Sequence, residues 1–183
     1  MPFYFENWLD FEHCASRLHT TGSIDSVRDI WWKMRPHPDF GTLEVRIGDM
    51  PGCRDDAIAY IAYVRAEAMA AMHAEAMPRV HPSLIRENRW RASRYGIHAT
   101  MIDPFTEDLV PVLDWLEIRL NMLATCGIKQ SDLELVARRI GHWRRYAGGG
   151  AMQRRLRNGL NGKDNAAFSA MIAAMRAQDG WSA

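Results

Sequence analysis

Four charged residues fall at alternating positions in the segment WWKMRPHPDFGTLEVR, with a spacing that suits phosphoryl or carboxylate chemistry. Side chains alternate between the two faces of a β-strand. If the two arms of this segment pair as a hairpin, one face carries Lys33, Arg35, Glu44 and Arg46. A site that handles phosphate, a divalent metal ion and an acidic substrate needs such a carboxylate among cations. A solvated sheet face with cross-strand ion pairs produces the same pattern, so alternation alone leaves both interpretations open.

The element that must position these side chains is a predicted β-hairpin over residues 27–49. Its first arm is expected to place Asp29 and Trp31 on the charged face, while the alternate residues are apolar. Pro36, Pro38 and Gly41 lie between the arms, which is typical of a loop. An isolated two-stranded hairpin is marginally stable in water, so helices must cover it or further strands must extend it.

The rest of the chain is predicted to be helical. An arginine-rich helix over 83–96 begins near Ser83, a possible N-cap, and ends at Gly96. Residues 97–103 are ambiguous between strand and loop. Apolar periodicity predicts further helices over 5–19, 55–77, 106–124, 131–146, 152–160 and 165–178, the last four within a helical C-terminal part over 105–180. The predicted fold is α+β and helix-rich, with about six helices and one antiparallel hairpin.

Length and composition suit one globular domain over residues 1–183, with 48% apolar and 25% charged residues. The net charge of +1 gives no argument for a nucleic-acid or membrane partner. No apolar run approaches the ~18 residues of a membrane helix. Three cysteines without a C-x-x-C pair favour neither disulfides nor a zinc site. We therefore expect free thiols, a cytoplasmic location and no membrane partner.

Two strings resemble the C-terminal half of the glutamate–cysteine ligase type 2 family, whose members are also described as carboxylate–amine ligases. They are WWKMRPHPDFGTLEVRIGD, within Ile30–Asp49, and RENRWRASRYG, over Arg86–Gly96. The resemblance implies a glutamine-synthetase-like catalytic fold with an open sheet chamber, and ATP and Mg²⁺ as cofactors. It also implies that a glutamate carboxylate is phosphorylated to an acyl phosphate, which the amine of cysteine or a related compound then attacks.

The resemblance also implies roles for particular residues. Glu44 would be a metal ligand, and Arg46 would clamp the transferring phosphoryl group or the substrate carboxylate. Arg35 is a weaker candidate for a second clamp. On the arginine-rich helix, Asn88, Arg91 and Arg94 are candidates for cofactor binding, although the sequence does not indicate which face of that helix looks inward.

A magnesium cluster needs several carboxylates, and the resemblance places most of them in an N-terminal half that is not matched here. We therefore expect the lone chain to bind Mg–ATP weakly without turnover. We rank three explanations for the unmatched N-terminal half. In order, they are a truncated gene or misassigned start, a split enzyme with a separate second chain, and a remnant with another role. The expected partner is the missing half or a second copy of the chain.

A rival hypothesis rests on the basic last quarter of the chain, which holds Arg138, Arg139, Arg144 and Arg145 and further arginines beyond them. This cluster could belong to a nucleic-acid-binding module. No known nucleic-acid-binding motif accompanies it, so the ligase hypothesis is preferred. A non-catalytic assembly module that exposes an apolar helix stripe to a partner is the remaining alternative.

Overall fold

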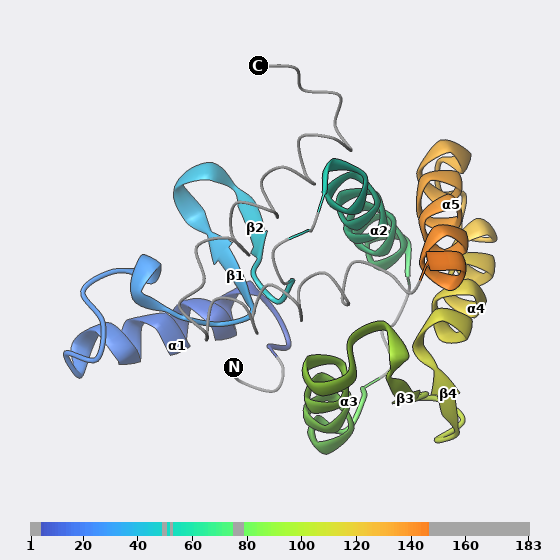
Figure 1. Cartoon of the computed structure of the whole chain (residues 1–183). Helices are drawn as coiled ribbons and strands as arrows, with labels where there is room; N and C mark the ends of the chain where they lie inside the picture. The colour runs from blue at the N-terminus through green and yellow to red at the C-terminus, as the bar shows by residue number, and fades with distance from the viewer. Residues whose placement is uncertain (1–4, 49–50, 52, 75–78, 147–183) are drawn as a thin grey trace, which may run out of the picture. The chain divides into compact units, whose positions relative to one another are not determined.

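The computed structural model of the chain describes residues 5–48, 51, 53–74 and 79–146 (Figure 1). The chain divides into two compact units, residues 1–50 and 51–183, and each unit is described by itself. The prediction of one domain over the whole chain stays a prediction. The two helices predicted over 152–160 and 165–178 lie outside the described residues.

The first unit begins with a short helix, α1 (Trp8–Thr20). The side chain of Asn7 accepts a hydrogen bond from the backbone N–H of Asp10 at 3.1 Å. Such an N-cap satisfies an N–H that has no acceptor inside the helix, so α1 starts at Trp8 rather than at the predicted Phe5. Phe11 is buried and its ring contacts Trp32, with the centroids 6.3 Å apart. This contact packs α1 against the segment that leads into the hairpin.

The charged hairpin consists of two four-residue strands. β1 (Met34–His37) pairs antiparallel with β2 (Thr42–Val45), and the register sets Arg35 directly opposite Glu44. Directly opposite residues in a ladder have their side chains on the same face. The prediction that Arg35 and Glu44 share a face is therefore confirmed.

The first arm of the hairpin is shorter than the prediction of 27–49. Residues Val27–Asp29 form a 3₁₀ turn, η1, because Ser26 and Asp29 make a capping box. The hydroxyl of Ser26 accepts from the N–H of Arg28 at 3.1 Å, and the carboxylate of Asp29 accepts from the N–H of Ser26 at 2.9 Å. These two bonds hold the backbone in a turn where the alternation of side chains predicted a strand.

The second unit is built around α2 (Arg54–His73), α4 (Val112–Ala124) and α5 (Gln130–Tyr146). α5 packs against both of the other helices. Alanines on α2 allow this close approach, because small side chains at a helix contact shorten the distance between the axes. The buried core residues that the three helices share are Ala62, Ala66, Leu113, Leu120, Leu123, Leu133, Val136 and Ile140.

The arginine-rich helix forms as predicted, as α3 (Pro82–Tyr95), and the 3₁₀ turn η3 (Gly96–His98) follows it. Its N-cap is His81 rather than Ser83, because the imidazole of His81 accepts from the Ser83 N–H at 3.3 Å. Gly96 ends the helix with a φ of 58°, a left-handed value that favours glycine.

A second hairpin, which the sequence did not predict, follows α3. β3 (Thr100–Ile102) pairs antiparallel with β4 (Leu109–Pro111). The helix predicted over 106–124 is therefore wrong in its first part and begins at Val112. The carboxylate of Asp103 accepts hydrogen bonds from two backbone N–H groups farther along the loop, at 2.8 and 3.1 Å. This side chain starts the turn that returns the chain to β3.

The described residues thus form a helix-rich α+β structure with two small antiparallel sheets, which confirms the predicted fold class. The glutamine-synthetase-like architecture stays a prediction. Among the described residues, every helix is too short or too polar to cross a membrane.

Candidate functional site

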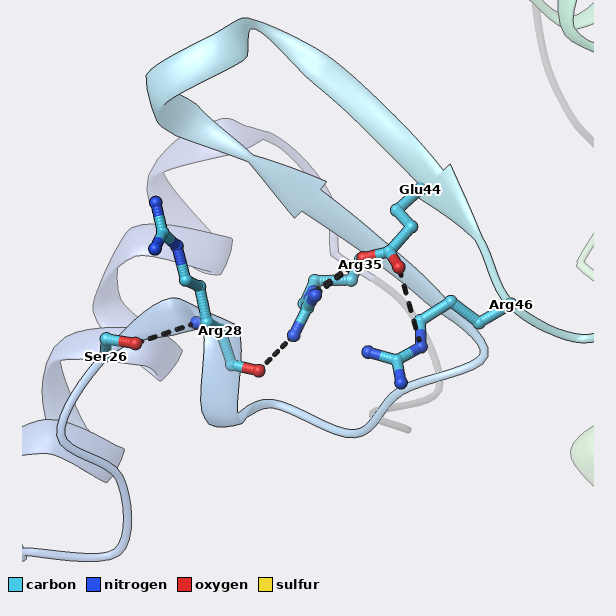
Figure 2. Close-up of polar contacts among 5 residues, drawn as sticks. All are labelled: Ser26, Arg28, Arg35, Glu44 and Arg46. Carbon is cyan, nitrogen blue, oxygen red and sulfur yellow. Dashed lines mark hydrogen bonds and ion pairs between the residues drawn. The ribbon is translucent and has the colours of Figure 1, made fainter.

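The charged face of the β1–β2 hairpin gathers Glu44 between two arginines (Figure 2). Glu44 Oε2 accepts hydrogen bonds from Arg35 Nε at 3.0 Å and from Arg35 Nη2 at 2.6 Å. Glu44 Oε1 lies 3.8 Å from Arg46 Nε, a distance that makes an ion pair but not a hydrogen bond. Lys33 joins this cluster through its backbone, because its carbonyl accepts from the Arg46 N–H at 2.7 Å. Its side chain is exposed.

Arg35 is the buried member of the cluster, with 8% of the residue exposed. Besides its two bonds to Glu44, its Nη1 donates to the backbone carbonyl of Arg28 in η1. The turn that shortened the first arm therefore supplies an acceptor for the buried guanidinium. The contact with substrate predicted for Arg35 stays a prediction, and the observed bonds of Arg35 are to the protein itself.

Arg46 is held from two sides. Its guanidinium carbon lies 4.5 Å from the ring centroid of Trp31, a cation–π contact, and its Nε faces Glu44. The Arg46 side chain is 23% exposed, and Trp31 is 79% exposed. The strand pattern grouped Trp31 with the charged face but assigned it no role. The structure shows that its ring covers one face of Arg46.

The donor set at this site fits one ligand of a magnesium ion. Magnesium is commonly held by one or two carboxylates together with phosphate oxygens and water. The Glu44 side chain is 43% exposed, and within the described residues its Oε1 has only the long ion pair with Arg46. Nowhere in the described part of the chain do three or more His, Cys, Asp or Glu side chains gather around a common point. Glu44 could therefore hold magnesium only together with ligands from phosphate or from elsewhere.

Two of the three residues on α3 that were predicted to contact the cofactor form hydrogen bonds inside the second unit. Asn88 donates from Nδ2 to the Ile102 carbonyl and accepts at Oδ1 from the Ile102 N–H, both at 2.7 Å. Arg91 donates from Nε to Glu87 Oε1 at 2.9 Å and from Nη1 to Thr100 Oγ1 at 3.1 Å. The bonds to Ile102 and Thr100 join α3 to β3 of the second hairpin. A role for either residue in binding ATP stays a prediction.

Arg94 differs, because it is exposed and its guanidinium lies over aromatic rings. Its carbon is 5.7 Å from the Trp90 ring centroid and 5.6 Å from that of Tyr95. Trp90 is 52% exposed, so it is not a core residue of this unit. Asn88 and Arg91 would have to break the hydrogen bonds named above before they could contact a ligand. Arg94 would only have to leave its contacts with the two aromatic rings.

The basic stretch of α5 is partly neutralised. Arg139 Nε lies 2.5 Å from Asp56 Oδ1, and both side chains are nearly buried. Arg144 Nη2 lies 2.5 Å from Asp114 Oδ1 and 3.0 Å from Glu117 Oε2. Two of the four described arginines in this basic quarter therefore contact carboxylates of their own unit. Arg138 and Arg145 are exposed, and the basic residues beyond Tyr146 lie outside the described residues.

A comparison with protein families covers nearly the whole chain. The model described as glutamate–cysteine ligase family 2 matches residues 1–174. The chain belongs to the glutamate–cysteine ligase family 2. This match extends the resemblance seen in the charged hairpin and the arginine-rich helix to both units.

Individual family 2 relatives agree with this assignment. Two are named "Putative glutamate–cysteine ligase 2". The one from Gloeobacter violaceus is 43% identical over 64% of this chain and 32% of its own length. The one from Solibacter usitatus is 39% identical over 68% of this chain and 33% of its own length. A protein from Natronomonas pharaonis named "Glutamate–cysteine ligase" is 32% identical over 70% of this chain and 37% of its own. The chain thus spans about a third of the length of these curated relatives.

Sequence reasoning missed two features of this family 2 hairpin, the Arg28 carbonyl and the stacking of Trp31. The first had a readable signal, because Ser26-x-x-Asp29 is a capping-box pattern with Asp in the place of the more common Glu. The second had none, since alternation places a ring on a face but does not reveal which side chain it covers.

Proposed function

We propose that this family 2 chain carries part of the active site of an ATP-dependent carboxylate–amine ligase of the glutamate–cysteine type. In this proposal the terminal phosphoryl group of ATP passes to the side-chain carboxylate of glutamate and forms an acyl phosphate. The amine of cysteine or a related compound then displaces phosphate and forms an amide. Family membership and the names of the relatives support the ligase class. The reaction itself, its cofactors and its substrates are part of what we propose.

The observation that carries this proposal is the pairing of a half-exposed carboxylate with a cation on one face of the β1–β2 hairpin. Glu44 and Arg46 lie two residues apart on the same face, with Glu44 Oε1 and Arg46 Nε 3.8 Å apart. Phosphoryl transfer depends mostly on positioning and on neutralising charge. A carboxylate and a guanidinium side by side supply both kinds of contact.

Arg46 would bind the negatively charged oxygens of the transferring phosphoryl group or of the substrate carboxylate. A guanidinium offers parallel N–H donors that match two oxygens of such a group. Because Trp31 covers one face of Arg46 and Glu44 lies beside Nε, the side chain needs little reordering when a ligand arrives. Lower reordering cost favours binding of the ligand.

Glu44 would hold magnesium through Oε1, and the ion would supply neutralisation of phosphate charge. One carboxylate is too few for the metal cluster that the reaction requires. The proposal therefore includes further carboxylates supplied by another part of the ligase, either a longer product of the gene, a separate chain or a second copy. By itself the 183-residue chain is proposed to bind Mg–ATP weakly without turnover.

In the part of the chain that the structure describes, no observation favours the nucleic-acid or assembly alternatives over the ligase. The ion pairs of Arg139 and Arg144 reduce the positive potential on which a nucleic-acid interface in the described part of α5 would depend. Family membership supports a ligase instead.

A titration with Mg–ATP, observed by ligand NMR because weak binding is expected, tests this proposal on the full chain. Replacing Arg46 with Gln removes the charge-assisted hydrogen bonds, so the affinity should fall by roughly tenfold. Arg17→Gln is the matched control, because Arg17 is an exposed arginine of the same unit on α1. Equal Mg–ATP affinity in Arg46→Gln and Arg17→Gln would show that Arg46 does not bind Mg–ATP, which would contradict the proposal.

A further inference from the structure

We propose that Arg35 is a positioning residue for Glu44, which holds the carboxylate by Oε2 and leaves Oε1 as the oxygen that binds a divalent metal ion. This inference rests on the proposed function and deepens it. It gives Arg35 a different role from the substrate clamp that the resemblance implied.

The hydrogen bonds of Arg35 are concentrated on one oxygen. Its Nε and Nη2 both donate to Glu44 Oε2, at 3.0 and 2.6 Å. The common fork of an arginine with a carboxylate instead uses both oxygens. With both donors on Oε2, the other carboxylate oxygen, Oε1, faces Arg46 Nε at 3.8 Å (Figure 2), and the Glu44 side chain is 43% exposed.

Arg35 is itself fixed on its far side. Its Nη1 donates to the Arg28 carbonyl, and η1 is held by the capping box of Ser26 and Asp29. The hairpin register places Arg35 directly opposite Glu44. The guanidinium is therefore held by its strand at one end and by a capped turn at the other, so it can fix the orientation of the carboxylate that it binds.

The two arginines beside Glu44 differ in burial and in distance. The Arg35 side chain is 10% exposed and hydrogen-bonded, whereas that of Arg46 is 23% exposed and 3.8 Å from Oε1. A buried cation whose donors already meet protein acceptors has little capacity left for a ligand. Partners that orient a metal ligand from behind commonly occupy such a position, and their loss costs 10–100-fold in metal affinity.

The experiment uses Mn²⁺–ATP as a probe for the full chain, with free and bound Mn²⁺ distinguished by electron paramagnetic resonance. Arg35→Ala should weaken Mn²⁺–ATP binding by roughly tenfold or more. Added guanidinium chloride at low millimolar concentration should restore it, because the ion fills the vacated space and again donates to Oε2. Arg35→Lys should stay weak, since an ammonium on a flexible stem does not reproduce two donors in fixed geometry. Arg17→Ala and Arg17→Lys are the matched controls.

Affinity in Arg35→Lys equal to that of the unchanged chain would overturn the inference, since charge alone would then suffice. A folded Arg35→Ala variant that guanidinium does not rescue would also overturn it. If Arg35→Ala fails to fold, the NMR signal of the Arg35 Nε–H in the unchanged chain tests the inference instead. It should exchange slowly with water and shift in Glu44→Gln, and a rapidly exchanging signal contradicts the inference.

Failure of the inference and failure of the proposed function give different results. If Glu44→Gln binds Mn²⁺–ATP as tightly as the unchanged chain, Glu44 is not the metal ligand and both fail. If Glu44→Gln loses binding while the Arg35 variants retain it, the metal role of Glu44 stands and only the positioning role of Arg35 is lost.

Discussion

At the scale of single residues, Trp31 is the exposed aromatic side chain that the cluster uses to hold a cation. Its ring lies 4.5 Å from the guanidinium carbon of Arg46. A cation–π contact at an exposed site contributes about 0.5–1 kcal/mol. Such a contact is too weak to stabilise the unit much, but it restricts the orientations that Arg46 can adopt before a ligand binds.

Replacing Trp31 with Ala should therefore weaken Mg–ATP binding by about two- to fivefold, the factor that this contact energy corresponds to. Trp31→Phe should lose less, because a smaller ring still covers the guanidinium. The same NMR titration measures both variants. Trp8, a half-exposed tryptophan on α1 of the same unit, provides the control as Trp8→Ala. Equal losses in Trp8→Ala and Trp31→Ala would show that the effect is not local to Arg46.

The charged face could be predicted from sequence because strand alternation is a local property. Arg35 and Glu44 meet as expected, and Arg46 lies beside them. The partner that each side chain contacts could not be predicted. That Arg35 uses the Arg28 carbonyl depends on a backbone turn, and that Asn88 binds Ile102 depends on a hairpin that the sequence did not reveal.

At the scale of elements, a buried polar contact ties the start of α2 to the end of α5. Asp56 Oδ1 accepts from Arg139 Nε at 2.5 Å and from Trp143 Nε1 at 3.1 Å. Asp56 and Arg139 have side chains only 10% and 12% exposed. Their bonds therefore compensate charges that burial would otherwise make costly.

Asp56→Ala leaves Arg139 buried without its carboxylate, so the free energy of unfolding should fall by about 3–5 kcal/mol. Urea denaturation followed by circular dichroism measures this change. Asp55→Ala, which removes an exposed carboxylate in the same first turn of α2, should cost far less. Similar losses in the two variants would contradict the buried role of Asp56.

A second contact joins α2 to α4 and predicts a dependence on pH. Glu67 accepts from Arg119 Nε and Nη2 at 2.8 and 2.6 Å. Burial acts to raise the pKa of Glu67, but hydrogen bonds from Arg119 and Tyr63 outweigh it and hold the pKa below its ordinary value. A carboxyl with a lowered pKa adds stability that is fully present above the pKa of the unfolded chain, about 4.3. This stability is lost as the pH falls through the lower pKa of the folded state.

Glu67→Gln should therefore unfold more easily than the unchanged chain at neutral pH, by about 1–3 kcal/mol. The difference should shrink as the pH falls below about 4.3. Thermal and urea unfolding from neutral pH to pH 3 measure it, with Glu134→Gln on an exposed face of α5 as the control. A difference between Glu67→Gln and the unchanged chain that stays constant over this range would refute the pKa assignment.

Most of the helices could be predicted because amphipathic periodicity and glycine stops are local signals. The failure at residues 106–111 has a physical reason. Leu109 and Val110 suit either a helix or a strand, and the decision depends on pairing with β3. Short apolar runs of this kind cannot be assigned by periodicity, since a partner strand determines their conformation.

At the scale of the whole molecule, the chain matches its family over residues 1–174 but spans about a third of the length of its curated relatives. Among the described residues of the charged hairpin, Glu44 is the carboxylate that contacts Arg35 and Arg46. We expect the purified 183-residue protein to form no ADP that depends on both glutamate and cysteine, because a single carboxylate does not build a magnesium cluster. A coupled ADP assay checks this expectation, and dependent turnover by the lone chain would contradict it.

The most direct test of the ligase proposal is the activity of the native protein, captured by an antibody from its own cells together with whatever accompanies it. The account predicts ADP formation that requires glutamate and an amine, and that disappears when Arg46→Gln is introduced at the gene while Arg17→Gln leaves it intact. Intact mass measured on the same material would show whether a longer chain or a separate partner supplies the other carboxylates. Native material without this activity, or activity that survives Arg46→Gln, would contradict the central claim.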